Sequence, residues 1–138
     1  MKLRTFLHLT CAAVAGLVLA PRTHATSIYQ YKPDEYVQID SGLSPNGQYS
    51  IRAHGEGEIG ADNFHVYLFD AKTGRKIGPL EEVVNNLDTS ADMVSARWSD
   101  DSRFVSLTYR IDRHEYAEVR YRIEKGRAHC IKNTNKKH

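Results

Sequence analysis

The sequence predicts an all-β protein in which two four-stranded antiparallel meander sheets pack together as one small domain. Three observations lead to this prediction. Apolar and polar residues alternate along several short stretches, turn-forming residues separate these stretches, and the order of strand and turn occurs twice. We expect a single domain over residues 26–138, because a mature chain of this length buries one core and not two.

Residues 1–25 have the composition of a secretory signal peptide. Lys2 and Arg4 precede an apolar run that is short for a membrane span, and small residues follow it. We expect cleavage after Ala25. Cys11 lacks the small residue that precedes the cysteine of a lipoprotein signal, so we expect no lipid or membrane anchor. The sequence therefore predicts a secreted or periplasmic protein.

The mature chain has a nearly balanced charge. The leader carries three of the 19 Lys and Arg residues and none of the 17 Asp and Glu residues, which leaves a net charge of −1. This balance argues against a generally basic nucleic-acid-binding protein. Residues 26–92 have a net charge of −6 and residues 93–138 one of +5. Because the halves attract, we expect a closed monomer, with a head-to-tail oligomer as the alternative.

The first half of the mature chain contains four predicted strands within residues 36–80. Two of them alternate in polarity on either side of a Ser-Pro-Asn-Gly turn. The third is a near-continuous apolar run, which is typical of a strand covered on both faces. These strands are Val37 to Leu43, Tyr49 to Ala53, His65 to Phe69 and Lys76 to Leu80. Residues 81–93 read as a connection with at most a short helix.

The second half, residues 94–132, contains a hairpin whose alternation is the clearest in the chain. Apolar residues alternate with polar ones in residues 105–112 and again in residues 117–123. A three-residue loop, residues 113–115, places Leu107 opposite Tyr121 on one apolar face. A two-residue loop would instead pair apolar with basic residues, so we predict the three-residue loop.

An internal repeat relates the two halves. The turn Leu43-Ser44-Pro45-Asn46-Gly47 corresponds to Trp98-Ser99-Asp100-Asp101-Ser102, with the two serines in register 55 residues apart. Residues 67–75 likewise correspond to residues 121–127. Each half therefore has the order strand, turn, strand, loop, strand, tight turn, strand.

At these residues, over about residues 36–132, the chain resembles the blades of TolB-type and WD-repeat β-propellers. Such blades often carry a Trp-Ser-Pro-Asp-Gly-like turn between their first and second strands. The resemblance implies a four-stranded meander for each half and implies no activity, since function depends on sites and not on folds. Closed propellers have at least four blades, so we expect these two repeats to pack on each other.

The candidate ligand-binding residues are Arg110, Arg120 and Arg122, on the polar face of the predicted hairpin. Planar guanidinium groups suit an anionic ligand such as a carboxylate, a phosphate or an acidic protein loop. The alternative is an exposed face kept soluble by mixed charges, with Arg110 opposite Glu118. Cys130 is the only cysteine of the mature chain, so we expect either a half-buried strand residue or an intermolecular disulfide.

The polar residues before the third strand are a second candidate site. His54, Glu56 and Glu58 alternate and His65 follows, so that they could hold a divalent cation. Their spacing matches no established ligand motif, and a solvated loop explains them equally well. We assign no metal and no cofactor.

No catalytic set is found in the sequence, and we predict that the protein is not an enzyme. The Gly-x-Gly-x-x-Gly spacing at residues 55–60 lacks a following helix, and Asp100-Asp101-Ser102 reads as a turn. We therefore predict a secreted or periplasmic non-enzymatic binding module of unknown ligand. The alternatives are a small secreted enzyme inhibitor, for example of a wall-degrading enzyme, and a metal-dependent enzyme. Residues 133–138 are expected to form a flexible tail.

Overall fold

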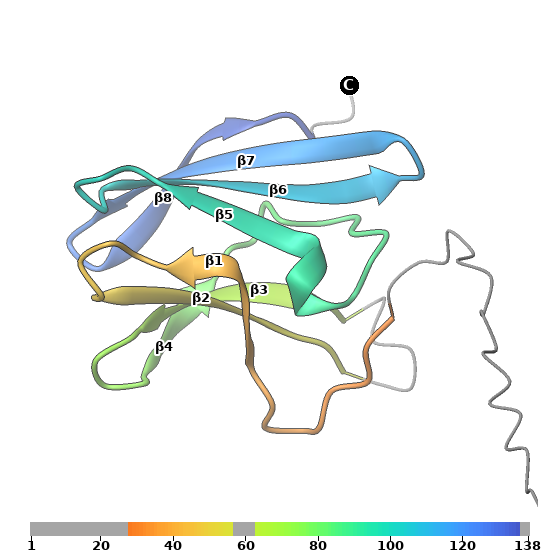
Figure 1. Cartoon of the computed structure of the whole chain (residues 1–138), viewed down its shortest axis with the longest axis horizontal. Coiled ribbons are helices and arrows are strands. Elements are labelled where there is room, and N and C mark those ends of the chain that lie inside the picture. Colours follow the sequence, from red (N-terminus) through yellow and green to blue (C-terminus); the bar gives the residue numbers. More distant parts are fainter. Residues whose placement is uncertain (1–27, 57–62, 136–138) are drawn as a thin grey trace, which may run out of the picture.

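The computed structural model describes residues 28–56 and 63–135, which form eight strands and one short 3-10 helix (Figure 1). The expected signal peptide, residues 1–25, and Glu58 lie outside the described residues. The elements are β1 (Val37–Leu43), β2 (Tyr49–His54), β3 (His65–Asp70), β4 (Lys76–Pro79), η1 (Ala91–Met93), β5 (Val94–Trp98), β6 (Phe104–Asp112), β7 (Glu115–Glu124) and β8 (Arg127–Asn133).

The eight strands belong to one sheet, in the order β4-β3-β2-β1-β5-β6-β7-β8, and this sheet curls until it is nearly closed into a barrel (Figure 1). All neighbours are antiparallel except β1 and β5, which are parallel with Asp40 opposite Ser95. The all-β prediction is confirmed, but the prediction of two separate four-stranded sheets was wrong. Each half is a meander, and the free edges of β1 and β5 pair because that pairing satisfies their backbone groups.

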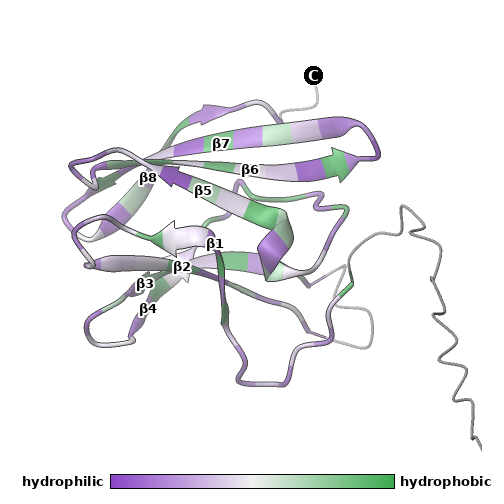
Figure 2. Cartoon of the chain, viewed as in Figure 1, coloured by the Kyte–Doolittle hydropathy of each residue, from purple (hydrophilic) through white to green (hydrophobic). Residues whose placement is uncertain are grey.

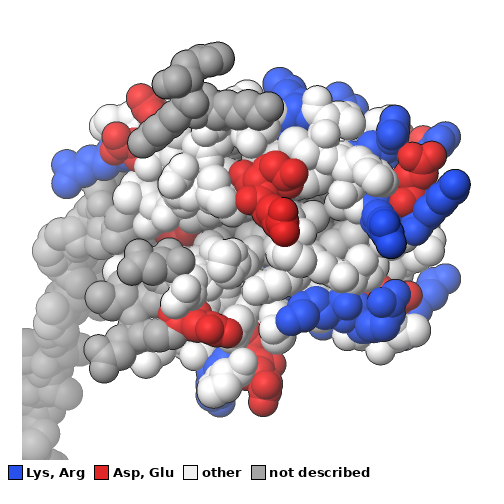
Figure 3. Space-filling model, turned by 180° about the vertical axis from the view of Figure 1, so that it is seen from behind, with Lys and Arg blue, Asp and Glu red and all other residues white. Residues whose placement is uncertain are grey.

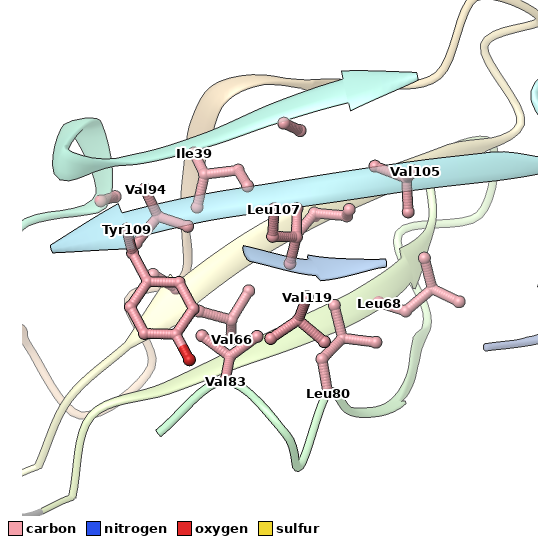
Figure 4. Close-up of a cluster of buried hydrophobic side chains, with 14 of the residues drawn as sticks. Ile39, Val66, Leu68, Leu80, Val83, Val94, Val105, Leu107, Tyr109 and Val119 are labelled. Atoms are coloured by element: carbon pink, nitrogen blue, oxygen red, sulfur yellow. The ribbon is translucent and has the colours of Figure 1, made fainter. Parts of the chain in front are cut away.

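Both halves contribute to one apolar core inside the curled sheet (Figure 4). Hydropathy alternates along the strands, as expected when one face of each strand points inward (Figure 2). The segment after β4 also contributes, through Leu80 and Val83. The labelled core residues are Ile39, Val66, Leu68, Leu80, Val83, Val94, Val105, Leu107, Tyr109 and Val119.

A bulge interrupts β1 and changes which side chains face inward. The register with β2 shifts between Gln38 and Leu43, and Ser41 has a φ of 55°. Gly42 approaches the neighbouring strand so closely that a Cβ there would lie 2.6 Å from the carbonyl oxygen of Ile51. Leu43, which the alternation assigns to the apolar face, is consequently 51% exposed.

A second bulge corrects the prediction for the β6–β7 hairpin. The turn contains two residues, 113 and 114, and the register shifts between Arg110 and Asp112. The predicted three-residue loop was therefore wrong, and Leu107 lies opposite Val119. The bulge adds one unpaired residue to β6, between Arg110 and Asp112. Apolar residues of β6 therefore still lie opposite apolar residues of β7. Arg110 lies opposite Tyr116 and not opposite Glu118.

The turns after β1 and after β5 have the same side-chain hydrogen bonds. Ser44 Oγ donates to Asn46 Oδ1 over 2.7 Å, and Ser99 Oγ donates to Asp101 Oδ1 over the same distance. Each serine oxygen also accepts from the backbone N–H five residues on. The two turns touch, because the backbone N–H of Asn46 donates to Ser102 Oγ over 3.0 Å.

The connection between β4 and η1 is a loop held by side chains of the second half. Tyr121 Oη donates to Glu82 Oε2 over 2.7 Å, and Asn135 Nδ2 donates to the carbonyl oxygen of Val84 over 2.6 Å. Three residues of 3-10 helix agree with the expectation of at most a short helix. Within the expected tail, Thr134 and Asn135 make hydrogen bonds to the rest of the fold and Asn135 is buried, whereas residues 136–138 lie outside the described residues. Cys130, expected to be half-buried, is exposed on β8.

Candidate functional site

Arg110 has a partner within the fold. Its Nε donates to Asp88 Oδ2 over 2.9 Å and its Nη2 donates to Asp88 Oδ1 over 2.8 Å. The Asp88 side chain is only 3% exposed, so this bidentate pair ties the connection before η1 to β6. Because the guanidinium of Arg110 is committed to Asp88, Arg110 is not part of the candidate surface.

Arg120 and Arg122 project outward from β7, where they alternate with buried residues, and both are exposed. Arg120 lies opposite Lys132 of β8 on one side and opposite Ser106 of β6 on the other, and Ser106 lies opposite Arg97 of β5. Arg97, Ser106, Arg120 and Lys132 thus form one row across four strands, which we call the basic row. Three strand spacings make it roughly 14 Å long.

A hollow of about 200 Å³ lies in the basic row between Arg97 and Arg120. Ser106, between them in the row, is small and 9% exposed, which leaves room between the two longer side chains. The guanidinium of Arg120 lies 5.2 Å from the centre of the Phe104 ring, which restrains it on one wall of the hollow. Two guanidinium groups and a hydroxyl around one hollow can hold a carboxylate, phosphate or sulfate group.

Other charged groups near the hollow moderate its positive potential. Glu118 also lines the hollow, and its Oε1 lies 3.7 Å from Lys132 Nζ. Arg122 Nη2 lies 3.3 Å from Glu124 Oε2, and both side chains of that pair are about half exposed. Such exposed pairs are weak and exchange readily. The indole Nε1 of Trp98, another lining residue, has no hydrogen-bond partner among the described residues.

Sequence reasoning missed Arg97 as a member of this surface. The alternation of Val94 and Ala96, which face inward, with Ser95 and Arg97 does place Arg97 outward. Its position beside Arg120 depends, however, on the register of β5 with β6 and of β6 with β7. The length and shape of two turns fix these registers. The hollow could therefore be predicted only if both registers were known.

Basic side chains also gather toward one side of the molecule when it is seen from behind (Figure 3). Acidic side chains are fewer on that side and scattered elsewhere on the same face. A positive field of this kind attracts anionic partners over distances up to about one Debye length, roughly 8 Å at physiological salt.

Of the candidate metal residues, His54, Glu56 and His65 are described, and the His54 side chain is held by contacts within the fold. His54 lies opposite His65 across β2 and β3, and its Nε2 lies 3.8 Å from Glu56 Oε1. The His54 side chain is 3% exposed, its Nδ1 lies 2.6 Å from the carbonyl oxygen of Glu35, and its ring stacks on Tyr36 with the ring centres 4.7 Å apart. Within residues 28–56 and 63–135, no group of three His, Cys, Asp or Glu side chains could hold a metal ion.

Comparison with known proteins identifies no family for this chain. No protein-family model and no curated protein matches its sequence. Among the described residues, no helix is long and apolar enough to cross a membrane. The function must therefore be inferred from the chain's own surfaces.

Proposed function

We propose that the mature chain is a secreted or periplasmic, non-enzymatic binding module that holds an anionic ligand, or an acidic loop of a partner protein, on the outer face of β5–β8. The observation that carries this proposal is the hollow of about 200 Å³ between Arg97 and Arg120. Its lining groups suit the binding of a carboxylate, phosphate or sulfate.

The basic row contributes little to the fold itself, which supports a role in binding. Arg97, Arg120 and Lys132 are exposed, and exposed ion pairs contribute only about 0–1 kcal/mol each. Ordering long side chains costs conformational entropy. The side chains stand on four neighbouring strands of one sheet, so their relative positions are set before a ligand arrives, which favours affinity.

The double variant Arg97→Ser/Arg120→Ser tests this proposal. Calorimetry of the mature protein with phosphate, citrate and a polyglutamate peptide should show binding by at least one probe that weakens as salt is raised. The double variant should lose about tenfold in affinity for that probe while its unfolding midpoint stays close to that of the wild type.

The matched control is Arg113→Ser/Arg127→Ser, which removes two exposed arginines that do not line the hollow. It should retain wild-type affinity. Equal losses in both double variants would show that only net charge matters, and the proposal would fail. It would also fail if none of the three probes bound to the wild type. Replacing Arg120 and Arg122 by Ser should likewise leave stability nearly unchanged, and unfolding would reassign these arginines to the scaffold.

An enzyme inhibitor is the second candidate function, and the β6–β7 hairpin favours it. These are the longest strands, of 9 and 10 residues, and their turn extends beyond the neighbouring strands (Figure 1). Tyr116 beside the turn is 66% exposed, so the tip could enter the cleft of an enzyme. Assays with lysozymes and other wall-degrading enzymes should then show inhibition that Tyr116→Ala abolishes. Full enzyme activity at a large excess of the protein would exclude these targets.

A further inference from the structure

A second cavity lies between the segment before β1 and the η1 region, away from the basic row. Its volume is about 250 Å³. Pockets for drug-sized ligands start at about 300 Å³, so this one fits a small head group. The residues that line it are Tyr29, Tyr31, Glu35, Val37, Gln38, Ser90, Ala91 and Asp92.

Two tyrosine rings form an aromatic corner in this cavity. The ring centres of Tyr29 and Tyr31 lie 4.7 Å apart with an interplanar angle of 72°. Tyr31 is 9% exposed, and its hydroxyl donates to the carbonyl oxygen of Thr89 over 2.8 Å. This hydrogen bond joins the segment before β1 to the connection before η1, so the corner is fixed by contacts from both sides.

A carboxylate is held in place at the same corner. The Tyr29 hydroxyl donates to Glu35 Oε1 over 2.5 Å, and the backbone N–H of Lys32 donates to Glu35 Oε2 over 3.0 Å. The hydrogen bond from Lys32, followed by that from Tyr29, lowers the pKa of Glu35 below its usual value. Glu35 is therefore ionised at neutral pH. Asp92, which accepts a hydrogen bond from Ser90, adds a second carboxylate to the lining.

We propose that this pocket binds an organic ammonium group, either a lysine side chain of a partner or a quaternary ammonium such as choline. Aromatic faces attract cations through their quadrupole, and a fixed carboxylate adds direct charge complementarity. Apolar side chains of Val37 and Ala91 suit the methyl or methylene groups that surround such a nitrogen. The site goes beyond the proposed anion-binding function, since it lies on other residues and selects the opposite charge.

The first test compares charged ligands with a neutral ligand of the same shape. The ¹⁵N-labelled mature protein is titrated with choline, with Nα-acetyl-lysine methylamide and with 3,3-dimethylbutan-1-ol, the neutral isostere of choline. At least one ammonium probe should shift the amide signals of Gln38 and Ala91 in a saturable manner that weakens with salt. Tighter binding of choline would identify a quaternary ammonium ligand, and tighter binding of the lysine derivative a protein side chain.

The second test removes one charge at a time. Glu35→Gln should weaken ammonium binding by about tenfold, which corresponds to about 1.4 kcal/mol. Asp92→Asn should weaken it less, and it provides an independent measurement if Glu35→Gln unfolds, because Asp92 is exposed. The matched control is Glu115→Gln, at the exposed start of β7, and it should bind as the wild type does.

Three results would overturn the proposal. These are saturable binding of the neutral isostere with equal affinity, wild-type affinity in both Glu35→Gln and Asp92→Asn, and the absence of shifts at Gln38 and Ala91 with either ammonium probe. The Arg97→Ser/Arg120→Ser variant should retain ammonium binding, so the failure of one proposal is distinguishable from the failure of the other.

Discussion

At the scale of single residues, the ion pair of Arg110 and Asp88 shows how a long connection is fixed to the sheet. The backbone N–H of Leu87 donates to the carbonyl oxygen of Arg110 over 2.8 Å, beside the bidentate contact of the side chains. Asp88 lies in a stretch with the composition of a loop, 22 residues before its partner. Alternation along a strand shows only which face of that strand a side chain lies on. It identified Arg110 as a candidate, but it could not predict that the Arg110 guanidinium would bind Asp88.

Removing the charge of Asp88 should destabilise the protein. We expect Asp88→Asn to lower the free energy of unfolding by about 2–3 kcal/mol, because it leaves the partly buried guanidinium of Arg110 without a full counter-charge. Urea denaturation measures this difference. Glu124→Gln is the control, since its pair with Arg122 is exposed at both ends, and it should change stability by about 0.5 kcal/mol or less. Equal effects of the two substitutions would contradict the structural role of Asp88.

Tyr121 should make stability depend on alkaline pH. Burial, followed by the hydrogen bond to Glu82, raises the pKa of Tyr121 above its ordinary value of 10.0. The folded state thus favours the protonated phenol, so this stabilisation is complete below pH 10 and is lost as the pH rises above 10. Between pH 10 and 11 the wild type should lose stability more steeply than Tyr121→Phe, by at most about 1.4 kcal/mol per pH unit.

Urea midpoints measured from pH 8 to pH 11 test the role of Tyr121. Tyr116→Phe, which removes an exposed tyrosine from the same strand, is the matched control. If Tyr121→Phe had the same slope as the wild type above pH 10, the phenol of Tyr121 would not be the group that titrates on unfolding.

At the scale of elements, the strands could be predicted from the sequence and the bulges could not. Six of the strands, β1 to β3 and β5 to β7, bury side chains in the core, and where one face is buried and the other is not, polarity alternates with the period of two that locates the strand. A bulge adds one residue to a strand without changing the kinds of residue that the strand contains, as at Ser41 in β1 and near Ile111 in β6. The loop prediction for the β6–β7 hairpin failed because a shorter turn with a bulge preserves the same faces as a longer turn without one.

The bulge in β1 predicts a position that accepts only glycine. Gly42→Ala should lower the free energy of unfolding by about 1–3 kcal/mol, because the added Cβ would lie 2.6 Å from the carbonyl oxygen of Ile51, which belongs to the backbone and cannot move alone. Gly78→Ala in β4 is the matched control, since no atom lies within 4 Å of its added Cβ. It should be neutral or slightly stabilising by thermal denaturation. Equal stability of the two variants would show that β1 relaxes around the methyl group.

The candidate surface was predictable only in part, because its residues lie on different strands. Alternation correctly placed Arg120 and Arg122 on the outer face of the hairpin, where both are exposed. Arg97 joins Arg120 across Ser106 through two strand registers, and no periodicity within one strand reports a register between strands.

At the scale of the whole molecule, the two halves complete one another. The parallel pairing of β1 with β5 joins two meanders into a single sheet, and their inward faces form a single core. The opposite charges of the halves favour this arrangement. The pairing itself could not be predicted, because each meander has two free edges and alternation along a strand is the same whichever edge is paired.

This architecture predicts that neither half folds alone. Fragments 26–92 and 93–138 would each expose one side of the shared core and the free edge of β1 or β5, so each should lack dispersed amide signals in NMR spectra. The intact chain of residues 26–138 should unfold in one cooperative transition. Trp98 is the only tryptophan, and its ring stacks on Tyr49 of the other half at 6.5 Å, so its fluorescence reports contact between the halves. Urea curves from this fluorescence and from far-UV circular dichroism should coincide.

Two separate transitions, or a native-like spectrum from either fragment, would show that each meander is an independent unit and that the pairing of β1 with β5 is not required for folding.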